Sequence, residues 1–151
     1  MQQTRFDDAE CPVARTVDVV GDGWSLLIVR DAFDGSRRFG EFQRGLGVAK
    51  NILTTRLRAL VDAGVLEVVP AADGSSYREY ALTAAGRDLL PVIVALRQWG
   101  EVHAFGPGEE HSRLVDRAHG EPLRPLEIRA ADGRRVGPDD TVVEHLSSRA
   151  T

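Results

Sequence analysis

The sequence has little of several residue types, and each shortage excludes a class of protein. Its 151 residues include one cysteine, Cys11, so the chain alone can form neither an internal disulfide nor a cysteine-rich zinc site. Its longest apolar run, residues 89–96, is interrupted by Pro91 and is far shorter than the roughly 20 residues of a membrane-spanning helix. The first residues have no apolar segment typical of a signal peptide. These absences predict a soluble cytoplasmic protein with one domain and a small appendage.

Lysine is almost absent too: of 19 basic residues only Lys50 is a lysine, and a codon bias toward arginine would account for this. The 23 acidic residues give a net charge of −4, which argues against a polyanionic partner. The distribution of charge along the chain reverses that argument. Residues 35–58 contain six basic residues and one acidic residue, so this segment has a net charge of +5 and the rest of the chain has −9. This polarity is expected when one surface meets phosphate, although a solvated charged face would give the same count.

Apolar spacing predicts three short helices in the first part of the chain. The first, residues 13–20, ends at a Gly-Asp-Gly turn. Its apolar side chains recur at helical spacing: Val13, Val17 and Val20. The second, residues 24–33, begins with Trp24, which we expect in the core. The third, residues 39–44, is closed by Gly45.

A fourth helix, residues 49–63, has two different faces. Its apolar residues lie at i, i+4, i+7 and i+8 and form one buried stripe: Leu53, Leu57, Leu60 and Val61. The opposite stripe can hydrogen-bond base edges: Asn51, Thr54, Thr55 and Arg58. Lys50 and Arg56 flank this stripe, within reach of phosphates. Gly64 is the expected left-handed stop after the helix.

Two β-rich runs, residues 65–69 and 77–82, are joined by a polar loop and predict a hairpin. Thr83 is the expected N-cap of a long helix to about residue 105, which Pro91 kinks or breaks. We expect the apolar side of this helix to contact a second subunit, through Leu89, Val92, Ile93, Leu96 and Trp99.

Short helices, a polar-faced helix and a hairpin, in that order, predict a mainly helical α+β fold: a winged helix-turn-helix. The helix-turn-helix would span residues 39–63. We expect residues 1–105 to form this DNA-binding and dimerisation domain, including the long C-terminal dimerisation helix. Residues 106–151 would form a small β appendage.

Six short motifs, in this order, carry a resemblance over roughly residues 10–105: Cys11-Pro12, Gly21-Asp22-Gly23-Trp24, Arg38-Phe39-Gly40-Glu41-Phe42, Leu53-Thr54-Thr55-Arg56-Leu57-Arg58-Ala59-Leu60 with Gly64-Val65-Leu66, Tyr80-Ala81-Leu82-Thr83, and Trp99-Gly100. Together they resemble the HxlR family of bacterial transcriptional regulators, which is related to the MarR type. The resemblance implies a homodimer on an inverted-repeat operator of double-stranded DNA. It implies DNA contacts by Arg38, Lys50, Asn51, Thr54, Thr55, Arg56 and Arg58, with Arg78 on the wing. One departure is Ala49, because the family often has a serine there that caps the helix.

Cys11 has two interpretations. Free cysteines are commonly buried and inert. Alternatively, Pro12 favours the first position of a helix, which would make Cys11 the N-cap, where the helix dipole lowers the pKa of a thiol. In the resembled family a cysteine at this position senses electrophiles or oxidants in several members. With one thiol in the chain, a disulfide could form only between subunits or with a small thiol.

The appendage resembles a small ribbon-like extension of some family members, in which cysteines hold two knuckles. Here His119, Arg129 and Asp132 take the cysteine positions, and arginine does not bind metal. We therefore expect no metal and no cofactor, against the alternative of a site made by His111, His119 and Asp132.

Two classes of function remain open. The first is a DNA-binding transcriptional regulator that responds to an electrophile or oxidant at Cys11, or to a small apolar effector. The second is a winged-helix protein-interaction module that does not read DNA. An enzyme is not predicted, because Cys11 and His103 lie on separate segments and no catalytic arrangement occurs at a meaningful spacing.

Overall fold

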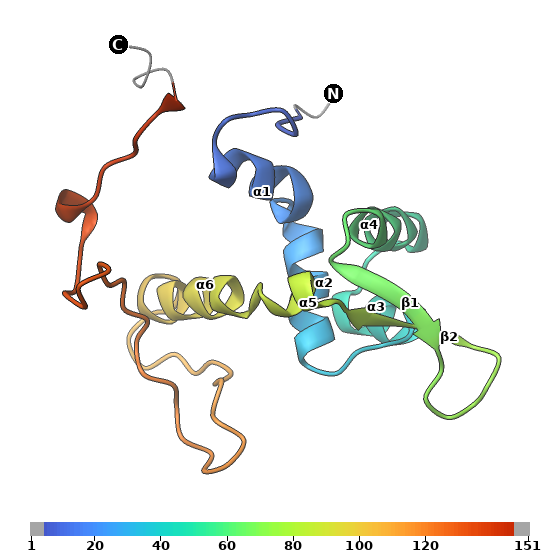
Figure 1. The fold of residues 1–151 in the computed structure, drawn as a ribbon. Helices are drawn as coiled ribbons and strands as arrows, with labels where there is room; N and C mark the ends of the chain where they lie inside the picture. Colours follow the sequence, from blue (N-terminus) through green and yellow to red (C-terminus); the bar gives the residue numbers. More distant parts are fainter. Residues whose placement is uncertain (1–4, 147–151) are drawn as a thin grey trace. The chain divides into compact units, whose positions relative to one another are not determined.

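The structure, a computed structural model, describes residues 5–146 (Figure 1). The chain divides into two compact units, Met1–Ile93 and Val94–Thr151. The first unit contains helices and one hairpin: α1 (Pro12–Val20), α2 (Gly23–Phe33), α3 (Phe39–Leu46), α4 (Lys50–Asp62), β1 (Leu66–Pro70), β2 (Arg78–Leu82) and α5 (Ala84–Arg87). Helix α6 (Leu90–His103) begins in this unit and continues into the second. Within the described part of the chain, no helix is long and apolar enough to cross a membrane.

The core of the first unit lies where α2, α3, α4 and β1 meet. Its most completely buried large side chains are Ile28, Phe42, Leu53, Leu57, Leu60 and Leu66. Phe42 packs edge-on against Tyr80 of β2, with ring centroids 6.3 Å apart. The predicted apolar stripe of the fourth helix is thus confirmed at Leu53, Leu57 and Leu60, and Val61 packs partly buried against it.

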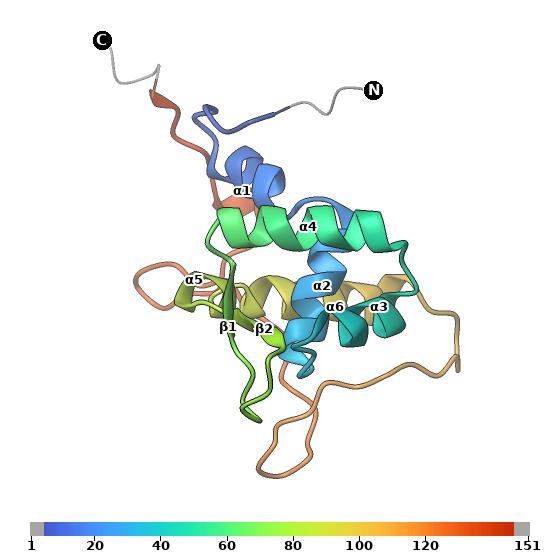
Figure 2. The same ribbon diagram turned by 90° about the vertical axis from the view of Figure 1, so that its right-hand side faces the viewer.

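The turn between α3 and α4 sets the helix-turn-helix (Figure 2). Gly47 adopts a left-handed φ of 63°, and its N–H donates to the carbonyl oxygen of Gln43 at 2.9 Å. The expected end at Gly45 was wrong: α3 continues through Leu46, because the left-handed stop falls at Gly47. After α4, Gly64 has a φ of 78°, so the predicted stop there is confirmed.

The wing is the antiparallel pair β1 and β2, in which Leu66 lies opposite Leu82 and Pro70 opposite Arg78. The predicted hairpin is therefore confirmed. The middle of β2 is anchored outside the hairpin, because the N–H of Tyr80 donates to the carbonyl oxygen of Arg37 at 2.7 Å. This bond ties the wing to the segment that enters α3.

The long helix predicted after the wing is broken before Pro91, into α5 and α6. Thr83 is the N-cap of α5, as predicted: its Oγ1 accepts from the N–H of Gly86 at 3.0 Å. A proline lacks the N–H that a continuous helix would need, which explains the break.

Two apolar residues of the first unit lie elsewhere than predicted. The expectation that Trp24 is in the core was wrong, since 37% of the residue is exposed. It lies in the first turn of α2, before the turns whose Ile28 and Val29 enter the core. On α1 only Val20 of the expected apolar side is buried, and Val13 and Val17 are exposed.

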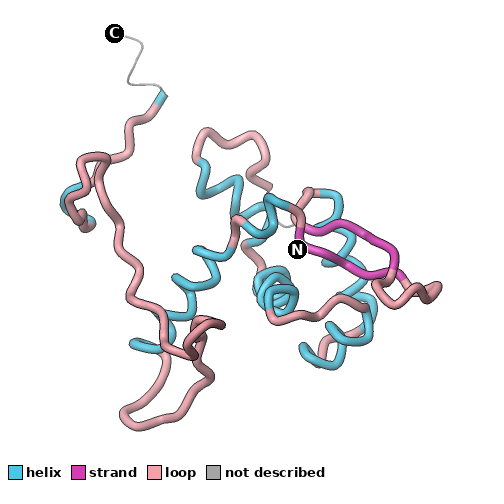
Figure 3. The backbone as a smooth tube through the Cα atoms, turned by 60° about the horizontal axis from the view of Figure 1, so that its bottom comes forward, coloured by secondary structure: helices cyan, strands magenta, loops and turns pink. Residues whose placement is uncertain are grey.

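The second unit combines α6 with a segment that is mostly loop (Figure 3). In its described residues this segment has two isolated β-bridges, Val115 with Pro122 and Arg129 with Arg135, and a 3-10 turn at Pro138–Asp140, in place of the expected strands. Side chains of α6 bond to this segment: Arg97 to Ser112 and Gln98 to Arg124.

Candidate nucleic-acid interface

The face of α4 opposite the core presents polar side chains to solvent. Its members are exposed: Asn51, Thr54, Thr55 and Arg58. The buried and polar stripes predicted for this helix are therefore both present in the structure. A helix-turn-helix exposes the second helix in this way to enter a DNA groove.

The polar groups of this face differ in how they are bonded. The hydroxyl groups of Thr54 and Thr55 donate to the carbonyl oxygens of Lys50 and Asn51, at 2.8 and 2.9 Å. Their oxygens keep lone pairs that can accept a hydrogen bond. Within residues 5–146, the side chains of Asn51 and Arg58 form no hydrogen bond or ion pair, so their donors are available to a ligand.

Arg38, the N-cap residue of α3, is held against the loop of the wing. Its Nη2 donates to Asp73 Oδ2 at 2.6 Å, and its guanidinium lies 5.1 Å from the ring centroid of Tyr77. The bonds from Ser75 and Arg38 lower the pKa of Asp73 to about 2. The side chain of Arg38 is thus held against the wing loop, and its charge is partly balanced by the carboxylate of Asp73.

A second ion pair, between Arg37 and Glu79, holds the wing loop to the segment before α3. Glu79 is buried, and its carboxylate accepts from the backbone N–H of Ala72 at 2.7 Å and from Arg37 Nε at 2.6 Å. These two bonds lower the pKa of Glu79. Glu41 holds the start of α3 in a similar way. Its carboxylate accepts from the backbone N–H groups of Arg38 and Arg37, and these bonds lower the pKa of Glu41.

Arg56 lies on the flank of α4 and is occupied within the chain. Its Nη1 pairs with Asp22 Oδ2 at 2.9 Å, and Asp22 is also the N-cap of α2. A phosphate contact by Arg56 would compete with this pair. Lys50 begins α4 and is exposed, and Arg78 is exposed at the start of β2.

The sequence did not predict the roles of Asp73, Tyr77 and Glu79, which hold Arg38 and Arg37 in place. Arg38 and Asp73 lie 35 positions apart, and Arg37 and Glu79 lie 42 apart, so no helical or strand periodicity connects them. The sequence offers one indication of these pairs: acidic residues occur in the hairpin that follows the arginine-rich segment 35–58.

The two remaining candidate sites also have a defined place. Cys11 is exposed and is the N-cap of α1, with Pro12 at the first helical position, as predicted. The residues of the alternative metal site, His111, His119 and Asp132, are not brought together, and the described residues contain no group of three suitable ligands. Asp132 bonds instead to Arg134, which lowers its pKa.

A hairpin behind a helix-turn-helix with an exposed polar second helix defines a winged helix-turn-helix transcription regulator, a class that binds DNA and is not a class of enzymes. Residues 19–105 match the model of the HxlR-like helix-turn-helix family. The chain belongs to this family, as its motifs predict.

Relatives and solved structures agree with this assignment. An uncharacterized HTH-type transcriptional regulator of Mycobacterium tuberculosis (strain H37Rv) is 42% identical over 124 residues, which are 82% of this chain and 78% of that protein. The crystal structure of PA1607, a candidate transcription factor, is 56% identical with a TM-score of 0.88, over 92% of this chain and 97% of that one. The redox regulator HypR in its reduced form is 33% identical with a TM-score of 0.57, over 62% of this chain and 94% of that one.

Proposed function

We propose that the protein is a homodimeric regulator that binds an inverted-repeat operator through α4. The observation that carries this proposal is the exposed hydrogen-bonding face of α4, Asn51, Thr54, Thr55 and Arg58, opposite its buried leucines. In this arrangement the two α4 helices of a dimer enter successive major grooves, roughly 34 Å apart. Residues 1–105 would be the DNA-binding and dimerisation part, with residues 106–151 as an appendage.

Individual residues would have different roles at the operator. Asn51 and Arg58 have unoccupied amide and guanidinium donors, which suit bidentate contacts to adenine and guanine. Lys50, Arg38 and Arg56 would set register through phosphates, Arg56 only by exchanging Asp22 for a phosphate. Arg78 would follow the backbone from the wing.

The proposed dimer contact is the exposed side of α6. Val92, Leu96 and Trp99 are exposed, with Leu96 at 50% and Trp99 at 66%. Leu89 and Ile93 pack against the core of the first unit and so would support the helix more than the contact. Apolar side chains in a row at helical spacing are typical of a surface that a partner covers.

We also propose Cys11 as a sensor of electrophiles or oxidants. Its exposure at the N-cap of α1 leaves the sulfur accessible to a small reagent, and the relative HypR is a redox regulator. Oxidant should change the operator affinity of the wild type and leave that of Cys11→Ser unchanged. An equal response of the two proteins would remove Cys11 as the sensor.

The experiment that tests the regulator is a selection of bound sequences from random duplex DNA, followed by titration of the selected site against salt. A palindromic site with a steep salt dependence is the expected result. Recovery of no sequence above background would favour a winged-helix module that meets an acidic protein.

A further inference from the structure

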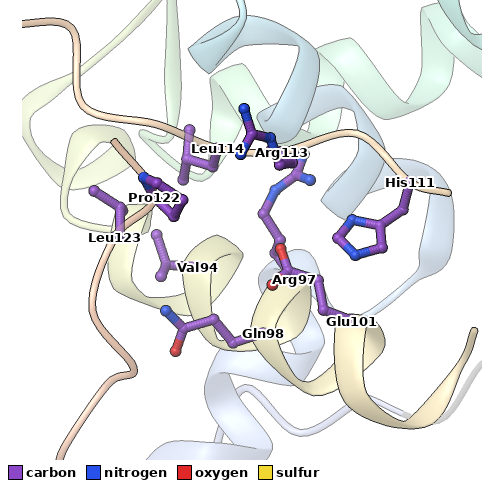
Figure 4. Close-up of a pocket in the computed structure, with 9 residues that line it drawn as sticks. All are labelled: Val94, Arg97, Gln98, Glu101, His111, Arg113, Leu114, Pro122 and Leu123. Carbon is purple, nitrogen blue, oxygen red and sulfur yellow. The ribbon is translucent and has the colours of Figure 1, made fainter. Parts of the chain in front are cut away.

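A pocket of about 240 Å³ lies within the second unit, between α6 and the segment that follows it (Figure 4). The floor comes from α6, through Val94, Arg97 and Glu101. The opposite wall comes from the segment, through Arg113, Leu114 and Leu123. None of the DNA-binding, sensor or dimer residues lines it.

Two polar anchors hold the walls of this pocket at a fixed separation. Arg97 Nη1 donates to both the carbonyl oxygen and the Oγ of Ser112, each at 3.0 Å. The side-chain amide of Gln98 donates to the carbonyl oxygen of Arg124 at 3.0 Å and accepts from the N–H of Leu126 at 2.7 Å. Specific bonds from two neighbouring residues of α6 therefore hold the segment against the helix at this pocket.

The lining is divided into an apolar and a charged part. Figure 4 shows Val94, Leu114 and Leu123 toward one side, and Arg97 and Glu101 toward the other. A ligand that fits such a lining has an apolar body and one charged end. The volume of the pocket is below the roughly 300 Å³ at which pockets for drug-sized molecules begin, so we expect a small ligand.

The charged part favours an anion. The lining contains two guanidinium groups, Arg97 and Arg113, against one carboxylate, Glu101. Within residues 5–146, Arg113 forms no hydrogen bond or ion pair, and Arg97 bonds to Ser112 through Nη1 alone. Guanidinium groups with unused N–H donors bind a carboxylate through paired, charge-assisted hydrogen bonds.

We propose that this pocket binds a small organic monocarboxylate whose apolar body packs against Val94, Leu114 and Leu123. The carboxylate accepts hydrogen bonds from Arg113 and from the unused donors of Arg97. An inorganic anion would leave the apolar part of the pocket unfilled, so the apolar body contributes to binding.

The position on α6 makes this site compatible with the proposed dimer. Residues 94, 97, 98 and 101 lie on one face of the helix, and Val92, Leu96 and Trp99 lie on the opposite face, at 100° per residue. A bound carboxylate and a second copy of the chain can therefore occupy α6 together. The binding step itself needs neither DNA nor a dimer.

Titration calorimetry on the full chain without DNA tests the proposal. The probes are hexanoate and benzoate, their neutral amides hexanamide and benzamide, and inorganic phosphate. We expect saturable binding of at least one carboxylate, with the matching amide and phosphate weaker by about tenfold, as for loss of a charge-assisted hydrogen bond. Arg113→Gln should weaken the carboxylate to a similar extent.

Arg117→Gln is the matched control, because Arg117 is an exposed arginine of the same segment that does not line the pocket. Its affinity should stay within about twofold of the wild type. No saturable carboxylate binding, equal binding of acid and amide, phosphate binding as tight as the carboxylate, or equal effects of the two substitutions would each overturn the proposal. Failure of DNA binding would leave it intact, since the readout contains no DNA.

Discussion

At the level of single residues, the basic segment 35–58 contains two kinds of charge. Three of its six basic side chains pair with acids: Arg37 with Glu79, Arg38 with Asp73 and Arg56 with Asp22. Lys50 and Arg58 have no such partner within residues 5–146. The net +5 counted along the sequence therefore overstates the charge that a phosphate would meet, because three acids from outside the segment lie against it.

Arg58 and Lys50 should separate base reading from phosphate binding. Arg58→Ala should weaken the selected site by about 1–3 kcal/mol and relax the preference at one base pair, since its guanidinium is the proposed base contact. Lys50→Ala should weaken specific and random DNA alike and reduce the salt slope by about one. Fluorescence anisotropy on both DNAs measures this, and identical profiles for the two variants would contradict the assigned roles.

Asp73 should restrain binding to DNA of any sequence. Asp73→Asn removes a carboxylate that pairs with Arg38 and so leaves one more uncompensated positive charge on the wing side. Affinity for random duplex DNA should rise, with a salt slope steeper by about one. Asp139→Asn in the appendage is the control. A rise in affinity of the same size for this variant would show that the effect comes from the total charge of the protein and not from the pair of Asp73 with Arg38.

At the level of elements, a buried carboxylate joins the wing to the rest of the first unit. Glu79 of β2 bonds to Ala72 in the wing loop and to Arg37 before α3, so it joins the hairpin to the helix-turn-helix. A hairpin of two short strands is marginally stable alone, and such bonds fix its orientation.

This carboxylate makes stability depend on pH. The folded state lowers the pKa of Glu79 below its ordinary 4.5, so its stabilisation is complete above that value and is lost as the pH falls through the lowered pKa. Thermal melting should show Glu79→Gln less stable than the wild type at pH 7, with the two converging in acid. Glu67→Gln, an exposed site on β1, is the control. A constant gap down to low pH would exclude this role.

The elements show what sequence can predict and what it cannot. Helices α1 to α4 and the hairpin follow from local patterns: apolar spacing, Pro12, Gly64 and Thr83. The polar face of α4 follows from the same periodicity. Contacts between distant segments do not, so the pairs of Arg38 and Arg56 were missed. Gly86 is similar: a Cβ there would lie 2.2 Å from the carbonyl oxygen of Val65, a close approach that no local pattern reveals.

At the level of the whole molecule, charge and apolar surface have separate roles. The chain outside residues 35–58 carries −9, which opposes nonspecific association with nucleic acid. In the proposed dimer, the exposed apolar row of α6 would instead contact a second copy of the chain. Specific binding would then come from two half-sites held together by this row.

Charges placed in this row should dissociate the dimer. Leu96→Asp should reduce the mass in sedimentation velocity to that of one chain, because a desolvated carboxylate in an apolar contact has no partner. Operator affinity should fall with it, since each monomer keeps one half-site. Val143→Asp, at an exposed valine of the appendage, should leave the mass unchanged. A wild type that sediments as a monomer at micromolar concentration would contradict the dimer.

The start of α4 has a thermodynamic consequence. Ala49 provides no side-chain cap, the first turn has no acidic residue, and the helix opens with Lys50, so its N-terminal amides and positive dipole end lack compensation from these positions. A DNA phosphate there would complete the helix, which links binding to folding. Ala49→Ser should therefore stabilise the unbound protein by about 1 kcal/mol and shrink the rise in Tm that operator DNA causes. Ala59→Ser, within the same helix, should do neither.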